Sequence, residues 1–218
     1  VTPAIADIFP GTLAALGLVS AIHESKTSGK GQFLDVSMYD AMLAFQKSAV
    51  AQYSFTGKPN PSGLQKAMTL YPFDLFPAKD GQVSIAVGQP HHWDLLCAAM
   101  ERGDMINDDR SATNTARLKN VEWVEEQICA WTSQLTRAEI MAKLDGSLPA
   151  GPVQNMSDIF KDEHVAARGM LDKCNPGGDN PDISLAASPI KFSRSKTSLY
   201  QSPPILGEHN KEVFAEFG

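Results

Sequence analysis

The chain has 218 residues and a net charge of −6, and its hydrophobic fraction of 43% and charged fraction of 20% are ordinary. A chain of this length can bury a core, and it allows one large domain or two modest ones. Nucleic-acid binding needs clustered Lys and Arg, which this acidic sequence lacks. We therefore expect a globular protein with no nucleic-acid partner.

The longest apolar run, residues 13–22, is roughly half the ~20 residues that a bilayer-spanning helix requires. No basic segment followed by an apolar one opens the chain as a signal peptide would. Cys97, Cys129 and Cys174 are too few and too widely spaced for a disulfide framework or a zinc site. We expect ordinary buried or half-buried thiols, no membrane contact, no metal and a cytoplasmic location.

The first predicted element is a helix that Pro10 and Gly11 open and that runs to about Lys26. Gly29 or Gly31 stops it. Apolar residues cover most of its circumference, so we expect it to be buried on nearly all sides. Asp7 lies directly ahead of this helix, and two readings are open: it caps the helix, or it is a nucleophile held at the helix N-terminus.

A short strand at residues 32–36 is predicted next, and Ser37 can cap the helix that follows it. That helix carries apolar residues at spacings of three and four, namely Met38, Ala41, Met42, Phe45, Ala49 and Tyr53. Helix, strand and helix joined by tight turns indicate an α/β layer arrangement. Pro and Gly within residues 57–63 mark a linker and a domain boundary.

Beyond the linker the sequence predicts a hairpin, because Asp80-Gly81 lies between apolar runs at residues 71–76 and 83–87. Two amphipathic helices follow. One spans residues 90–101 with Trp93, Leu96, Cys97 and Met100 on one face, and the other carries Val121, Val124, Ile128, Trp131 and Leu135.

Thr136 and Glu139 have the spacing of a capping box at the start of another helix. Residues 148–153 end this helical block, and residues 175–181 form a loop rich in Pro and Gly. A strand at residues 190–193 and a closing helix at about residues 210–216 complete the predicted elements.

Four stretches in this order resemble the class III CoA-transferases, a family that also includes the α-methylacyl-CoA racemases. The first runs from Asp7 to Ala41, with Ser28-Gly29-Lys30-Gly31-Gln32 standing for the family's Thr-Gly-Arg-Gly-Gln turn. The others are residues 76–81 with 85–88, residues 148–153 with 164–170, and residues 204–209. Family members are roughly twice this length, so the resemblance covers only their C-terminal half.

The resemblance implies an α/β fold, with part of a Rossmann-like large domain and a smaller α+β domain in an interlocked homodimer. Residues 1–52 would be the second part of the large domain, 53–67 a linker, 68–150 the small domain, and 151–218 a return segment with a C-terminal helix. The N-terminal half that carries most of the CoA-binding surface would be missing. Val1 in place of an initiator Met suits such a fragment, which we expect to be inactive alone.

The family's reaction moves CoA from an acyl-CoA to a free carboxylic acid, which implies that Asp7 is the catalytic nucleophile. Its carboxylate would attack the thioester to give a mixed anhydride and CoA thiolate, which returns to form an enzyme-bound CoA thioester. Acyl-CoA and CoA are then substrates, and no permanently bound cofactor is expected. Met38 resembles a substrate-binding position beside the nucleophile, although Met at helical spacing is usually part of a core.

Gln89 follows Val87-Gly88 where racemases of this family carry a Glu, and it is our second substrate-binding candidate. Because an amide cannot take up a proton, we favour the transferase over an acyl-CoA racemase or epimerase. His91 and His92 could substitute, but adjacent residues on a helix point in different directions.

The glycine-rich loop of formyl-CoA transferases is also absent, which argues against oxalate or formate and favours another dicarboxylic or hydroxy acid as acceptor. The missing half motivates a third hypothesis, a non-catalytic dimerisation or interaction module.

Overall fold

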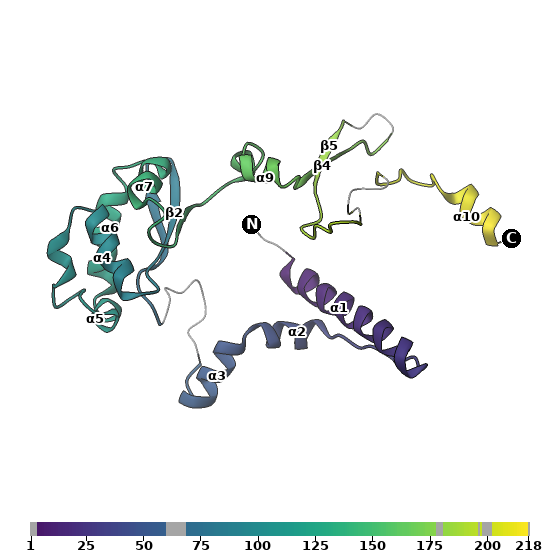
Figure 1. Ribbon diagram of the computed structural model, residues 1–218, viewed down its shortest axis with the longest axis horizontal. Coiled ribbons are helices and arrows are strands. Elements are labelled where there is room, and N and C mark those ends of the chain that lie inside the picture. Colours follow the sequence, from purple (N-terminus) through teal and green to yellow (C-terminus); the bar gives the residue numbers. More distant parts are fainter. Residues whose placement is uncertain (1–3, 60–68, 178–180, 196, 198–201, 218) are drawn as a thin grey trace. The chain divides into compact units, whose positions relative to one another are not determined.

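The computed structural model describes residues 4–59, 69–177, 181–195, 197 and 202–217 (Figure 1). The chain is mixed α/β and separates into two compact units, Val1–Gln65 and Lys66–Gly218, each of which we describe by itself. Residues 60–67, which hold most of the predicted linker, lie outside the described residues. The four-part division of the chain stays a prediction.

The described part of the first unit consists of α1 (Ile5–Ser28), α2 (Met38–Phe45) and α3 (Lys47–Thr56). Gly29 ends α1 with φ 72°, a left-handed conformation that glycine adopts without strain. As predicted, Ser37 caps α2: its hydroxyl accepts a hydrogen bond from the N–H of Asp40 at 3.3 Å. The predicted second helix is nevertheless interrupted, because Gln46 leaves the helical conformation (φ −92°, ψ 34°).

The predicted strand at residues 32–36 is wrong. These residues form no ladder with any described strand, and without a partner an extended segment cannot satisfy its backbone groups as a strand does. The segment contacts α1 instead. A Cβ built on Gly17 would lie 2.9 Å from Cδ1 of Leu34, so any larger residue at position 17 would displace the end of this side chain.

The predicted burial of α1 is also wrong within this chain. Pro10 is the buried residue of α1, whereas Leu16, Leu18 and Val19 are 64%, 55% and 65% exposed. A helix that is apolar all around its circumference is buried only when other elements pack against all its sides. Within the described residues, only one side of α1 is covered. We expected the apolar run at residues 13–22 to be too short for a bilayer-spanning helix, but the 24 residues of α1 are long and apolar enough to cross one. Core helices of soluble proteins meet the same criterion of length and composition.

The second unit contains a three-stranded antiparallel sheet of β1 (Phe73–Ala78), β2 (Gly81–Ala86) and β3 (Ala150–Pro152), in that order. The predicted hairpin is confirmed. Ala78 pairs with Gly81, so Lys79 and Asp80 form the turn. The third strand was missed, because residues 150–152 include a Gly and a Pro that weaken any strand signal.

Helices α4 (Pro90–Ala99), α6 (Val121–Thr132) and α7 (Arg137–Leu144) pack with this sheet around one core, and α5 (Asn114–Lys119) precedes α6 (Figure 1). The 3-10 helix η1 (Gly103–Ile106) follows α4. Both predicted apolar faces are confirmed: the buried residues include Trp93, Leu96, Cys97, Val124 and Ile128. The three cysteines are free and buried or half-buried, as expected.

The rest of the unit contains α8 (Met156–Ile159), α9 (Glu163–Ala167), β4 (Leu171–Cys174), β5 (Ile183–Ala186) and α10 (Asn210–Phe217). The closing helix is confirmed. The strand predicted at residues 190–193 is wrong, because β4 pairs with residues 183–186 instead. The loop prediction holds for residues 175–177 and 181, and residues 178–180 lie outside the described residues.

Candidate active site

Asp7 is the third residue of α1 and lies inside its first turn. Ala4 is the N-cap residue, and the N–H of Asp7 donates to its carbonyl at 3.0 Å. The alternative in which Asp7 caps the helix is therefore wrong. Its side chain is exposed, beside N–H groups whose partial positive charge favours an anion. Pro10 lies in the second turn, where its ring leaves the Ala6 carbonyl without a helical donor.

Met38 is the first residue of α2, the helix that packs against α1. Its side chain is 51% exposed, and Ala41 is the buried residue of α2, so Met38 is not part of a core within this chain. Phe9 and Phe45 join the two helices with their rings edge to face at 5.2 Å. Asp7 and Met38 thus belong to one packed pair of helices, whereas Gln89 belongs to the other unit.

Gln89 precedes α4 in an extended conformation (φ −132°, ψ 153°), and its side chain does not cap that helix. It lines a pocket of about 270 Å³, which we call the Arg117 pocket. The pocket is formed by Leu70, Val87, Gly88, Gln89, Pro90, Ala112, Thr113, Asn114 and Arg117. Gln89 is therefore one of the exposed residues at the edge of this pocket, and its role in substrate binding stays a prediction.

Arg117 is the charged group of this pocket, and its residue is only 3% exposed. Its Nε donates to the Tyr71 carbonyl at 2.6 Å and its Nη1 to the Ser111 carbonyl at 2.8 Å, while the guanidinium lies 4.7 Å from the Trp93 ring centroid. Burial lowers the pKa of Arg117 from its usual value. No carboxylate among the described residues forms an ion pair with it.

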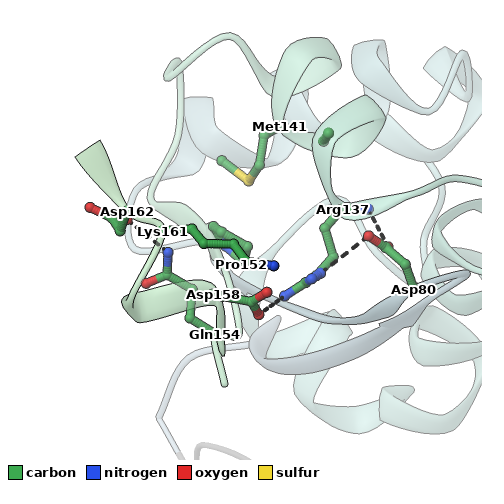
Figure 2. A pocket seen from close by; sticks show the side chains of 9 residues that line it. Asp80, Arg137, Met141, Pro152, Gln154, Asp158, Lys161 and Asp162 are labelled. Atoms are coloured by element: carbon green, nitrogen blue, oxygen red, sulfur yellow. Dashed lines mark hydrogen bonds and ion pairs between the residues drawn. The ribbon is translucent and has the colours of Figure 1, made fainter. Parts of the chain in front are cut away.

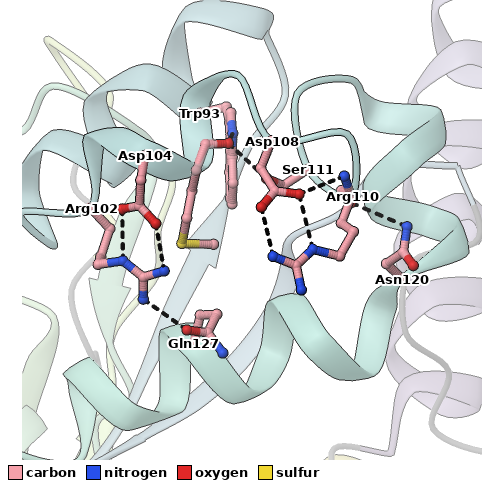
Figure 3. Close-up of polar contacts among 9 residues, drawn as sticks. Trp93, Arg102, Asp104, Asp108, Arg110, Ser111, Asn120 and Gln127 are labelled. Carbon is pink, nitrogen blue, oxygen red and sulfur yellow. Dashed lines mark hydrogen bonds and ion pairs between the residues drawn. The ribbon is translucent and has the colours of Figure 1, made fainter.

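A polar network fixes the loop between α4 and α5 that forms one wall of the pocket (Figure 3). Met105 is its centre, because its carbonyl accepts hydrogen bonds from Trp93 Nε1 at 3.3 Å and Ser111 Oγ at 2.7 Å. On either side Arg102 pairs with Asp104 and Arg110 with Asp108. The network holds Ser111, whose carbonyl in turn accepts from Arg117.

The rings of His91 and His92 contact each other edge to face with centroids 4.4 Å apart. His91 is exposed, whereas His92 is half-buried. The Nδ1 atom of His92 is buried without a hydrogen-bond partner in the described part of the chain. Within those same residues, no group of three or more His, Cys, Asp or Glu side chains could hold a metal ion.

A second cavity, of about 370 Å³, surrounds Arg137 at the start of α7 (Figure 2). Its guanidinium lies between two carboxylates, with Nη1 3.0 Å from Asp158 and Nε 3.4 Å from Asp80. Both acids have a lowered pKa, chiefly because of hydrogen bonds from Arg137. Sequence analysis identified neither Arg137 nor Arg117 as a site residue. The sequence signals closest to them were the capping box at residues 136–139, which contains Arg137, and Gln89, which lines the same pocket as Arg117.

Known proteins resemble this chain over its whole length. It is 37% identical over 218 residues to a protein named succinyl-CoA:mesaconate CoA-transferase from Haloarcula hispanica, covering 100% of this chain and 54% of the relative. It is 29% identical to a succinate–glutarate CoA-transferase of Agrobacterium fabrum, covering 98% of this chain and 53% of that protein. The chain thus spans about half the length of the curated relatives it matches.

The fold matches a crystal structure of a CAIB/BAIF family protein from Brucella suis with a TM-score of 0.81 and 29% identity. That match covers 100% of this chain and 56% of the other. The family model described as CoA-transferase family III matches residues 1–210. The resemblance carried by the four sequence stretches is confirmed, and the chain belongs to CoA-transferase family III.

Proposed function

We propose that the protein transfers CoA from an acyl-CoA thioester to a carboxylic acid through a covalent intermediate on Asp7. The observation that carries this proposal is the exposed carboxylate of Asp7 within the first turn of α1. An attacking carboxylate must be ionised and accessible, and a helix N-terminus favours the anion. A capping carboxylate would instead be occupied by backbone N–H groups.

The reaction exchanges one bond at a time. Asp7 attacks the thioester carbonyl, the C–S bond breaks, and CoA leaves as a thiolate with the electron pair. The thiolate attacks the Asp7 carbonyl of the mixed anhydride and expels the donor acid, which leaves a CoA thioester on Asp7. The acceptor carboxylate attacks this thioester and releases the thiolate. The thiolate then attacks the acceptor's acyl carbon, so that the new acyl-CoA leaves and Asp7 regains its carboxylate.

We infer that the acceptor is a small dicarboxylic acid. The relatives' names specify succinyl-CoA, mesaconate and glutarate, all derived from acids with two carboxyl groups. Gln89 at its pocket supports transfer over racemisation, because an amide cannot take up a proton. The substrates of the whole protein remain part of this proposal.

We also assign residues 1–52 to a Rossmann-like large domain within an interlocked homodimer, in which an N-terminal half of the same protein would cover α1. The exposed apolar residues of α1, among them Leu16 and Val19, support this assignment because a soluble protein rarely leaves such a surface uncovered. Met38, half-exposed on the helix packed against α1, would line the acyl site near the nucleophile.

The test is mass spectrometry of the whole protein after incubation with succinyl-CoA. A hydroxylamine-sensitive CoA adduct on the peptide that contains Asp7 is expected, and Asp7→Asn should abolish it. Asp40→Asn is the matched control, because Asp40 is also the third residue of its helix and is also exposed. An adduct that persists in Asp7→Asn would refute the proposal. Deuterium uptake at the α-carbon of a 2-methylacyl-CoA without CoA transfer would establish the racemase instead.

A further inference from the structure

We propose that Arg137 is a latch that holds α8 and α9 beside the start of α7, and that release of Asp158 from Arg137 lets these two helices rotate together about Val153 and Gln154. The proposed motion lies within the second unit and does not depend on the reaction at Asp7. Three features carry it: one donor atom that binds both sides of the hinge, a weakly attached segment, and charged groups that keep partners when the latch opens.

The first feature is the position of one nitrogen atom. Nη1 of Arg137 donates to the Val153 carbonyl at 2.6 Å and to the Asp158 carboxylate at 3.0 Å. Val153 is fixed to the sheet, because its N–H donates to the Gln82 carbonyl at 2.8 Å. Asp158 lies beyond the hinge, on α8. The guanidinium therefore binds the chain on both sides of the point where it leaves the sheet.

The two helices form one body through their own hydrogen bonds. Gln154 Nε2 donates to Asp162, the N-cap residue of α9, at 2.9 Å (Figure 2). Asn155 caps α8 and forms a capping box with Asp158. None of these bonds reaches the sheet or α7. A rotation of the backbone between Val153 and Gln154 therefore moves α8 and α9 without unfolding them.

The second feature is weak attachment. Every residue from 153 to 157 is exposed, and the described residues from 153 to 170 include no buried one. In the part of the chain that the structure describes, the contact between Arg137 and Asp158 is the one side-chain hydrogen bond or ion pair that joins residues 154–170 to residues 69–150. Segments with few buried contacts open at a small free-energy cost.

The cavity of about 370 Å³ around Arg137 separates the two sides further (Figure 2). Ala138 and Met141 of α7 line one side of it, and Lys161 and Asp162 line the other. Close packing of apolar side chains would resist any displacement. Because a cavity occupies this position, moving α8 and α9 disrupts little besides the ion pair.

The third feature is what happens to the charges on opening. Arg137 keeps Asp80, which accepts from its backbone N–H at 2.7 Å and lies 3.4 Å from its Nε. Asp158 keeps the N–H of Asn155 at 3.0 Å. Breaking an ion pair is costly chiefly when it leaves a charge without a partner. Neither group loses its last partner here, so the latched and released states lie close in free energy, as a reversible conformational change requires.

The test measures the distance between two nitroxide labels by pulsed electron paramagnetic resonance. The labels are attached to azido side chains incorporated at the exposed positions 126 of α6 and 167 of α9, which leaves the native cysteines unmodified. We expect a main distance and a minor one in the unaltered chain. Asp158→Asn should raise the minor population at least threefold. Asp109→Asn, the same change at an exposed position outside the latch, should leave it unchanged.

Salt gives a second measurement that needs no substitution in the latch. Raising NaCl from about 0.05 M to about 1 M screens an exposed ion pair, so the minor population should increase in the unaltered chain and not in Asp158→Asn. Thermal unfolding reports whether Asp158→Asn still folds, and the salt series decides the matter if it does not. Identical distance distributions with and without the ion pair would overturn the proposal.

Hydrogen exchange distinguishes rotation of α8 from its unfolding. The N–H groups of Ile159 and Phe160 donate to the carbonyls of Asn155 and Met156 within α8. Their exchange rates in Asp158→Asn should stay within about twofold of the original rates, because asparagine at position 158 can still accept from the Asn155 N–H. Rapid exchange of both groups would show that α8 melts when the ion pair is lost, which would also overturn the proposal.

Discussion

Arg137 and Asp158 form an ion pair at 3.0 Å that links α7 to α8, 21 residues further along the chain. The same Nη1 atom donates to the Val153 carbonyl at 2.6 Å. The backbone N–H of Arg137 donates to Asp80 at 2.7 Å, across 57 residues. Arg137 therefore holds together the hairpin turn, the start of α7 and the segment that leaves β3.

Arg137→Gln should lower the melting temperature more than Arg110→Gln. Arg137 connects three separate segments, whereas Arg110 pairs with Asp108 two residues away and lies 3.8 Å from the centroid of the Trp123 ring. Loss of one local ion pair changes little, but loss of a partner shared by two acids removes the ion pair of both. Thermal unfolding of both variants followed by circular dichroism is the measurement. Equal shifts would contradict a special role for Arg137.

Stability should decrease as the pH falls from about 4 towards 2. Hydrogen bonds from Arg137 lower the pKa of Asp158, and hydrogen bonds from Arg110 lower that of Asp108 to about 2. An acid whose pKa is lower in the folded state stabilises the fold above its unfolded value of about 3.9, and this contribution is lost as the pH falls through the folded value. Urea unfolding between pH 5 and pH 2 measures it. Arg137→Gln should show a shallower pH dependence, and an identical slope would count against the assignment.

Signals confined to a few neighbouring residues were read correctly from the sequence. Gly29 ends α1, Ser37 caps α2, and Thr136 with Glu139 forms a complete capping box. Each depends on backbone groups within four residues, so spacing alone determines the interaction. The start of α1 was placed too late, because Pro10 favours a first turn but does not prevent a helix from beginning at Ile5.

Features that depend on distant partners could not be predicted. A strand needs a second strand. Residues 32–36 and 190–193 have apolar patterns but pair with no strand in the part of the chain that the structure describes, whereas 150–152 pairs despite its Gly and Pro. The same holds for the site. Gln89 was identified from its place in a motif, but Arg117 acquires its environment from the Tyr71 carbonyl, 46 residues away.

Thr136→Ala should destabilise the second unit by about 1 kcal/mol, the usual effect of removing an N-cap side chain. The hydroxyl accepts from the N–H of Glu139 at 3.3 Å, and Glu139 accepts from the N–H of Thr136 at 2.7 Å. Thr115→Ala, at an exposed position inside α5, is the control and should have little effect. Urea unfolding compares the two, and an equal loss of stability would show that the capping box contributes nothing.

Ile128→Ala should cost about 2–5 kcal/mol, because Ile128 is fully buried where α6 meets the core and its loss leaves a cavity. Ile190→Ala makes the same chemical change at a side chain that is 59% exposed, and it should cost less than about 1 kcal/mol. Chemical denaturation gives both values. If the two variants lost similar stability, α6 would not pack as the structure describes.

Asp7→Glu separates a nucleophile from a charge that merely favours the helix. Glutamate keeps the negative charge in the first turn of α1 but moves the carboxylate by one methylene, and a misplacement of about 1 Å can cost roughly 10²-fold in rate. CoA transfer from succinyl-CoA, followed by chromatography of the acyl-CoA products, should therefore slow by about that factor. Asp40→Glu makes the same change at the equivalent position of α2 and should retain full activity. Full activity of Asp7→Glu would mean that its charge, and not its position, is what matters, and the nucleophile would have to be another residue.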